Sequence, residues 1–237
     1  MPSYDIQFQK GLSLQEFMAR YGSEDLCIKA VCIARWPNGF ECPECGSKRH
    51  CRLSRGLFKC QDCRKQTSPT AGTLFQGTKL PLTVWFQAMH LLTLGKHSVS
   101  ALELKRQLGV HYETAWAIKH KLMQVMMERE SQTVLSGRVE VDDAYMGGAR
   151  HEGNRGRGAP GKTPFVVAVQ TDPKHPAKVV CMRMKALQNV GGKGLKAWFS
   201  SGFDAGTQVL TDGWKAYRFL NGEGFKHESH KMPGGWR

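Results

Sequence analysis

The sequence lacks any apolar run long enough to cross a membrane, and its first residues, MPSYDIQFQKG, contain no apolar segment like that of a secretory signal peptide. These absences argue against a membrane protein and lead us to expect a cytoplasmic one. Its 237 residues, 41% hydrophobic and 23% charged, are typical of soluble globular structure. This length allows one large domain or two to three small ones.

Acidic residues are scarce relative to basic ones. There are 20 Asp and Glu against 34 Lys and Arg, which gives a formal net charge of +14 and a pI near 9.6. Such an excess favours a polyanionic partner, because each neutralised phosphate releases condensed counterions. The charge therefore indicates a nucleic-acid partner, although it does not distinguish DNA from RNA.

Cysteine is almost absent outside one segment. Seven of the eight cysteines fall between Cys27 and Cys63, and Cys181 stands alone. In a cytoplasmic protein, a cluster of this kind indicates metal ligands rather than disulfides.

Two Cys-x-x-Cys knuckles lie within that cluster. Cys42 and Cys45 form the first, and Cys60 and Cys63 form the second after an interval of 14 residues. Four thiolates close a tetrahedral structural zinc site without an open position. We therefore predict a zinc ribbon held by one Zn²⁺ ion, since a redox Cys-x-x-Cys motif would explain only one of the two pairs.

The neighbouring metal-binding residue types leave some alternatives. His50 and Cys51 could replace a ligand, although their spacing is poorer. Cys27 and Cys32 lie in the apolar stretch LCIKAVCIA and are expected to pack in a core.

Helical patterns follow the ribbon. LPLTVWFQAMHLLTLG, residues 80–95, predicts a helix that ends at Gly95, and Ser100 with Glu103 forms a capping-box pattern that starts another. Gly109 and Val110 predict a turn before a further helix at residues 111–126.

These helices have the outline of a helix-turn-helix, with an ordinary helical hairpin as the alternative. In the last helix, Ala115, Ile118, Leu122 and Val125 are expected to be buried, and the residues expected near a DNA major groove are His111, Tyr112, Glu113 and Lys119. Met123, Met126 and Met127 are expected to serve packing rather than a cofactor.

The stretch GRGAPGKT, residues 156–163, satisfies the phosphate-loop pattern by letter. A phosphate loop requires a strand before it and a helix after it, whereas a polar, glycine-rich stretch precedes this one and FVVAVQT follows. We therefore interpret it as a basic loop, in which Arg155, Arg157 and Lys162 are candidates for contacts with a nucleic-acid backbone.

The remaining sequence predicts an α/β domain. Strands are expected in GRVEVDDAYMGG, TPFVVAVQT, KVVCMRMKAL and TQVLTDGWKAY, with a helix around GLKAWFS before the last. Asp142 and Asp212 then fall near the ends of the first and fourth strands. Side by side they would suit Mg²⁺ ions and phosphodiester chemistry, whereas each aspartate alone also fits a turn or cap residue.

Several long motifs occur in one order: CPECGS, KCQDCRKQTSPTAGTLF, PLTVWFQAMHLL, VEVDDAYMGG and LTDGWKAY. In this respect the chain, from about residue 15 onwards, resembles the bacterial insertion-sequence transposases of DDE type that carry an N-terminal zinc ribbon, the ISXO-like group. The resemblance implies an RNase H-like catalytic domain with Mg²⁺ or Mn²⁺ bound by Asp142 and Asp212. It implies no catalytic role for Asp143, where such proteins often have another acid.

The resemblance also implies the partners. They are double-stranded DNA, as the terminal inverted repeats of the element and as target DNA, and at least one further copy of the chain for synapsis of two ends. A nucleoid-associated cytoplasmic location follows.

The family pattern continues beyond the second aspartate to a third acidic or Asn ligand on a later helix. After Asp212 the only acidic residues are Glu223 and Glu228, which we expect in a loop together with His227 and His230. A truncated remnant that binds DNA without catalysis is therefore the alternative prediction. The expected divisions are an N-terminal helical segment at 1–36, the ribbon at 37–75, the helix-turn-helix module at 78–132 and an incomplete RNase H-like domain at 136–237.

Overall fold

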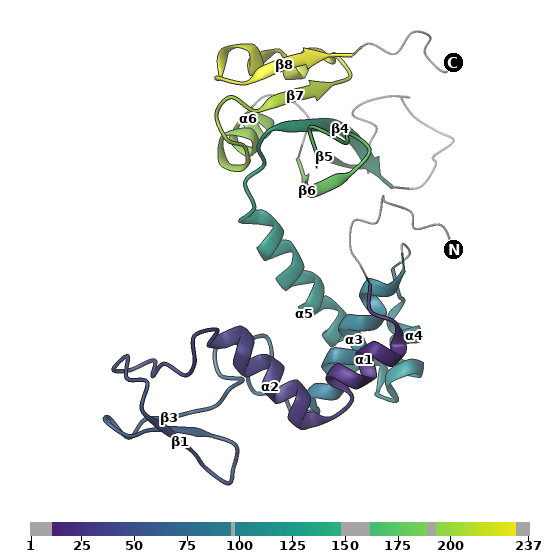
Figure 1. Ribbon diagram of the computed structural model, residues 1–237. Helices are drawn as coiled ribbons and strands as arrows, with labels where there is room; N and C mark the ends of the chain where they lie inside the picture. The colour runs from purple at the N-terminus through teal and green to yellow at the C-terminus, as the bar shows by residue number, and fades with distance from the viewer. Residues whose placement is uncertain (1–10, 96–97, 148–161, 189–192, 231–237) are drawn as a thin grey trace. The chain divides into compact units, whose positions relative to one another are not determined.

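The computed structural model describes residues 11–95, 98–147, 162–188 and 193–230 (Figure 1). The chain divides into two compact units, one formed by Gly11–Met126 and the other containing Met127 and the described residues after it. Across these ranges, no helix combines the length and apolar character needed to cross a membrane. The finer divisions within the first unit stay a prediction.

The first unit is built around four helices and most of a fifth. A core of Cys27, Val31, Phe75, Trp85 and Ile118, among others, joins these elements, so the prediction that Cys27 packs in a core is confirmed. The helices are α1 (Leu14–Tyr21), α2 (Glu24–Arg35), α3 (Leu82–Leu94), α4 (Ala101–Leu108) and α5 (Tyr112–Ser131).

Helix α3 receives its N-terminal cap from a different helix. Pro81 occupies its N-cap position and has no side-chain oxygen to accept a hydrogen bond. The Glu24 carboxylate of α2 instead accepts from the backbone N–H groups of Leu82, at 2.9 Å, and Thr83, at 3.2 Å. This contact satisfies two of the N–H donors that a helix start leaves without an intrahelical partner.

The predicted helix, turn and helix are present. Ser100 accepts a hydrogen bond from the backbone of Glu103, and Gly109 ends α4 with a φ of +65°, a left-handed conformation that favours glycine. Ala115, Ile118 and Leu122 are buried in α5 as predicted. The prediction for Val125 is wrong, because its side chain is 40% exposed.

The three methionines near the end of α5 do not serve packing within the described structure. Met123, Met126 and Met127 are all exposed. Met126 continues the spacing of Ala115, Ile118 and Leu122, but Leu122 is the last buried residue of α5.

The ribbon is a three-stranded antiparallel sheet with its own small core. Its strands are β1 (His50–Arg52), β2 (Phe58–Cys60) and β3 (Gln66–Thr67). Phe40, Cys42 and Cys60 are buried, and Trp36 and Phe58 pack against them. A core of this size cannot stabilise the sheet alone, which explains why the ribbon needs a metal.

The second unit contains a mixed five-stranded sheet with the order β6-β5-β4-β7-β8 (Figure 1). Strands β4, β5 and β6 are successively antiparallel, whereas β7 pairs with β4, and β8 with β7, in parallel. This is an RNase H-like fold. The elements are β4 (Arg138–Met146), β5 (Thr163–Thr171), β6 (Val179–Ala186), α6 (Lys193–Gly202), β7 (Gln208–Thr211), the 3-10 helix η1 (Lys215–Gly222) and β8 (Lys226–Ser229).

One face of this sheet carries the core. Val139 and Val141 of β4 are buried against Trp198 and Phe199 of α6, whereas Asp142, of opposite strand parity, is exposed. Residues of β4 therefore alternate between the core face and the exposed face of the sheet.

The end of the described chain differs from the expectation. Residues 215–222 form η1, whose Tyr217 and Leu220 are buried, and Glu228 lies in β8 rather than in a loop. The sequence KHES showed no apolar alternation because β8 is an edge strand with little buried surface. The parallel pairing with β7 holds it in place.

Candidate metal centres and nucleic-acid interface

The four predicted zinc ligands converge in the ribbon. The sulfur atoms of Cys42, Cys45, Cys60 and Cys63 all lie within 4.8 Å of one another. The Sγ atoms of Cys42 and Cys63 are 3.5 Å apart, and those of Cys45 and Cys60 are 3.6 Å apart. Zn–S bonds of about 2.3 Å in a tetrahedron place sulfur atoms about 3.8 Å apart. The cluster therefore fits one structural Zn²⁺ ion.

Backbone geometry prepares both knuckles for thiolate ligands. In the first, the Gly46 N–H donates to the Cys42 carbonyl at 2.9 Å, and Gly46 has a φ of +70°. In the second, Arg64 adopts a left-handed φ of 62°. Backbone N–H groups of Cys45 and Cys63 lower the pKa of Cys42 and, to about 7, the pKa of Cys60, whereas burial and the neighbouring thiols raise the pKa of Cys63. One cysteine of each knuckle thus favours the thiolate form that zinc requires.

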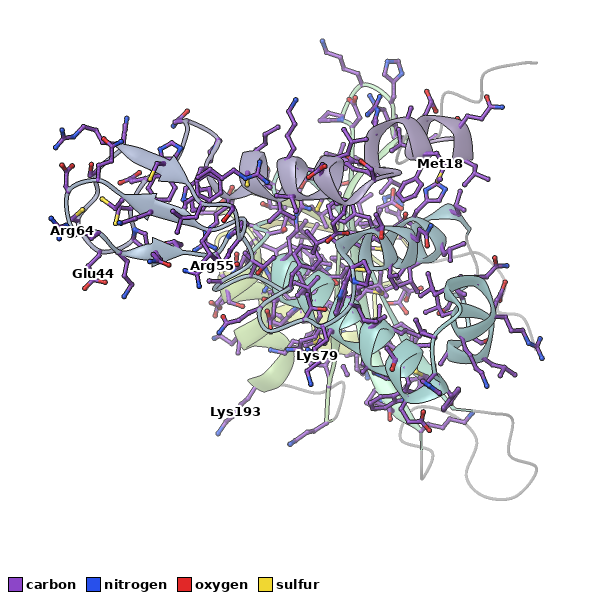
Figure 2. All side chains as sticks on the ribbon, turned by 90° about the horizontal axis from the view of Figure 1, so that it is seen from below. Met18, Glu44, Arg55, Arg64, Lys79 and Lys193 are labelled. Carbon is purple, nitrogen blue, oxygen red and sulfur yellow. The ribbon has the colours of Figure 1, made fainter. Side chains whose placement is uncertain are left out.

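The alternative ligands are excluded from the cluster. Within the described part of the chain, neither His50 nor Cys51 belongs to the group of converging ligand atoms, and both lie in β1 with exposed side chains. Figure 2 shows the sulfur atoms at the end of the ribbon sheet where the charged side chains of Glu44 and Arg64 project. The zinc end of the ribbon is thus rimmed by charged groups.

The second candidate centre lies where β4 and β7 run in parallel. Val139 pairs with Val209 and Glu140 pairs with Leu210. Two residues further along each strand, this register brings Asp142 and Asp212 to the same face and the same level of the sheet. The sequence left open whether these two aspartates are neighbouring metal ligands or separate turn residues, and the strand pairing brings them together.

Three carboxylates gather at this point. Ligand oxygens of Asp142, Asp143 and Asp212 all lie within 4.8 Å of one another. The Asp142 carboxylate accepts a hydrogen bond from the Asp143 N–H at 2.8 Å, and the Asp212 carboxylate accepts one from the Trp214 N–H at 2.9 Å. These bonds restrict how each carboxylate rotates.

The donor set has the chemistry of a Mg²⁺ site. Mg²⁺ prefers carboxylate oxygens at about 2.1 Å in an octahedron, so ligand oxygens on opposite sides lie about 4.2 Å apart. Asp142 and Asp212 are exposed, so water and phosphate oxygens can complete the coordination. Oxygen separations of at most 4.8 Å can close on such an ion with a small rotation of the side chains.

Sequence reasoning missed the groups that support Asp212. The Thr211 hydroxyl lies 3.0 Å from His227 Nε2, and His227 Nδ1 lies 3.0 Å from the side-chain oxygen of Asn221. The Gly213 N–H donates to the same hydroxyl at 3.3 Å. The sequence offered only a lone histidine in a polar stretch as a signal, and the parallel pairing of β8 gives it a partner.

The predicted DNA-contacting residues of α5 lie near its start. His111 is exposed, Tyr112 is 45% exposed and Lys119 is partly exposed. Trp116 is also 50% exposed, and its ring packs against that of His120 with ring centres 4.0 Å apart and planes tilted by 40°, an aromatic pair that sequence reasoning did not select.

The predicted basic loop is described only at its end. Lys162 lies directly before β5 and is partly exposed, whereas Arg155 and Arg157 lie outside the described residues.

An RNase H-like sheet with aspartates at the same level of two parallel neighbouring strands, in one chain with a zinc ribbon, is the arrangement expected of a DDE-type transposase. Comparison with known families agrees. Residues 134–235 match the ISXO2-like transposase domain, and residues 22–66 match the transposase zinc-ribbon domain. The chain belongs to this family of transposases.

A curated relative points in the same direction. An uncharacterized protein in the transposable element ISH50 of Halobacterium salinarum is 28% identical over 145 residues. The match covers 57% of this chain and 48% of the relative, so the chain spans about half the length of the relative that it matches.

Proposed function

We propose that the chain binds the ends of its insertion sequence as double-stranded DNA and catalyses metal-dependent strand cleavage and strand transfer. The observation that carries this proposal is the convergence of the Asp142 and Asp212 carboxylates across the parallel pairing of β4 and β7. Separate domains contribute to this activity: the ribbon at 37–75 and the helical module at 78–132 hold DNA, and the domain at 136–237 cuts it.

Asp142 and Asp212 supply carboxylate oxygens from two different strands, and a rigid sheet fixes their separation. Mg²⁺ or Mn²⁺ bound there would activate a water or 3′-hydroxyl for in-line attack and stabilise the departing oxygen. The neighbouring Asp143 lies close enough to add a third oxygen. The exposure of the site leaves room for a phosphodiester to approach along the open face of the sheet.

Cleavage of DNA carrying the sequences that flank this gene tests the catalytic role. Asp142→Asn is expected to abolish Mg²⁺-dependent nicking and joining, because the amide retains the size of the side chain but not its charge. Glu140→Gln is the matched control. Glu140 lies on the same face of β4, is 52% exposed in its side chain and does not belong to the carboxylate cluster. The Glu140→Gln variant should cleave DNA like the wild type.

Full activity of Asp142→Asn would refute the assignment. Specific binding of end DNA by the wild type without cleavage under either metal would instead support a DNA-binding remnant.

DNA binding is proposed to use the exposed face at the start of α5, with Tyr112, Trp116 and Lys119, together with the loop residues Arg155, Arg157 and Lys162. Each lost phosphate contact lowers the slope of log affinity against log salt by about 1. Lys119→Ala is therefore expected to weaken binding and flatten the slope. Lys121→Ala is the control, since Lys121 lies over the Trp85 ring, 5.9 Å from its centre, on another face of α5.

An equal effect of the two alanine substitutions would contradict this orientation of α5. Because two ends must be held at once, the active form is proposed to be a dimer or larger assembly that resides on the nucleoid.

A further inference from the structure

The carboxylate of Asp212 is held by the turn that follows β7. Its Oδ1 atom accepts from the Trp214 N–H at 2.9 Å, while the intervening Gly213 has a φ of +79° and donates its N–H to the Thr211 hydroxyl. The direction of the Asp212 side chain thus depends on the Thr211 oxygen, which orients the backbone of the turn. Thr211 is 5% exposed, so water contributes little there.

A histidine fixes that hydroxyl. A carboxamide oxygen only accepts hydrogen bonds, so His227 Nδ1 donates to the Asn221 oxygen at 3.0 Å. The second ring nitrogen, Nε2, then accepts the Thr211 hydroxyl proton at 3.0 Å. The Thr211 oxygen consequently presents its lone pairs to the Gly213 N–H. Each donor in this chain has one acceptor, and the chain runs in one direction from Gly213 to Asn221.

The burial of the ring agrees with this arrangement. Desolvation lowers the pKa of His227 below its usual value, so the ring is neutral at neutral pH and Nε2 can accept. The three partners also come from three elements: Thr211 from β7, His227 from β8 and Asn221 from η1. The network therefore ties the turn at the metal-binding edge to the last strand and to η1.

We infer that His227 is a positioning residue, which through Thr211 holds the turn that aims the Asp212 carboxylate at its divalent metal ion. The inference rests on the proposed function, since it concerns the same metal site. Hydrogen-bond partners behind metal ligands typically contribute 10–100-fold to metal affinity, because they hold the ligand in the binding orientation. His227 does not belong to the cluster of converging ligand atoms, so it acts on the metal site through the turn.

Mn²⁺ binding to the full, zinc-loaded chain tests the inference, with free Mn²⁺ measured by electron paramagnetic resonance. His227→Ala is expected to raise the dissociation constant for Mn²⁺ on the order of 10-fold. DNA binding without a divalent ion should stay unchanged, and a higher Mn²⁺ concentration should restore cleavage. Asp142→Asn defines the signal of this site, because it should remove the binding.

Three further variants separate positioning from general stability. Thr211→Val keeps the size of the side chain but removes the hydroxyl, and it should weaken Mn²⁺ binding as His227→Ala does. Thr211→Ser should keep the wild-type affinity. Combining His227→Ala with Thr211→Val should add nothing further, since both act through one chain. His230→Ala is the matched control, because its contribution is a backbone N–H bond to the Thr211 carbonyl that alanine preserves.

The outcomes are distinct. If folded His227→Ala or Thr211→Val binds Mn²⁺ as tightly as the wild type, the positioning role is wrong and the proposed function stands. A lowered melting temperature with an unchanged dissociation constant has the same meaning. If the wild type itself binds no Mn²⁺ in a manner sensitive to Asp142→Asn, both the proposed function and the inference fail.

Discussion

Replacing Asp142 with Asn should stabilise the protein in the absence of Mg²⁺ and destabilise it, relative to the wild type, in its presence. Oxygens of three carboxylates lie within 4.8 Å of one another. Two unit negative charges at about 4.8 Å repel by about 1 kcal/mol in water and by about 3.5 kcal/mol at an effective dielectric constant of 20. The fold brings these charges together, and unfolding separates them.

Because Asp142 is exposed, the lower of these values applies to each of its two neighbours, and salt screens part of it. The free energy of unfolding of Asp142→Asn should therefore exceed that of the wild type by about 1–2 kcal/mol without a divalent ion. Asn retains the oxygen that accepts from the Asp143 N–H, so the substitution isolates the charge. At a Mg²⁺ concentration of about 100 times the dissociation constant, the wild type should gain about 2.7 kcal/mol, and the variant much less.

Urea unfolding with and without Mg²⁺, followed by the fluorescence of the second unit's tryptophans, measures both differences. No chelator is added, so that the ribbon keeps its zinc. Glu140→Gln also removes one negative charge from β4. Its stability relative to the wild type should not change sign when Mg²⁺ is added. If Asp142→Asn is less stable than the wild type without Mg²⁺, the three carboxylates do not repel as described. If Mg²⁺ stabilises both proteins equally, the ion binds elsewhere.

Three other features give measurable outcomes. Glu24→Gln should destabilise the first unit by about 1–2 kcal/mol in thermal unfolding, because the charged cap of α3 is lost. Asp25→Asn, in the same turn of α2, is the control, and equal losses in the two variants would contradict the role of Glu24 as a cap. Gly202→Ala should lower the free energy of unfolding by about 1–3 kcal/mol, since a Cβ there meets the buried Arg183 guanidinium at 2.7 Å. The loss should be smaller in an Arg183→Met background, and an equal loss in both backgrounds would refute the clash. Removal of zinc should abolish hydrogen-exchange protection in residues 40–67 and leave the second unit's unfolding unchanged, whereas retained protection would show a ribbon that folds without metal.

Local patterns in the sequence were sufficient to predict several features of the structure. The zinc ligands could be predicted from the spacing of the two knuckles, because four cysteines in that pattern are typical of a structural zinc site. The end of α4 at Gly109 follows from the need for a left-handed residue there. The exposed side of β4 follows from the period of a strand, which separates Asp142 from Val141.

Long-range pairing decided the rest. Asp142 and Asp212 allowed two interpretations from local pattern, as metal ligands or as turn residues, and the parallel register of β4 with β7 brings them together. Val125 matched a buried helical position, yet exposure depends on which neighbours surround a helix and not on its period alone.

The polar stretch at 223–230 shows most clearly where prediction from local sequence pattern fails. No local pattern distinguishes His227 from a loop residue, because its role depends on Thr211 and Asn221, which other elements supply. Residue type and spacing determined which groups could bind metal. Strand pairing determined which of them meet and what holds them in position, because contacts between distant segments arise only when the sheet closes.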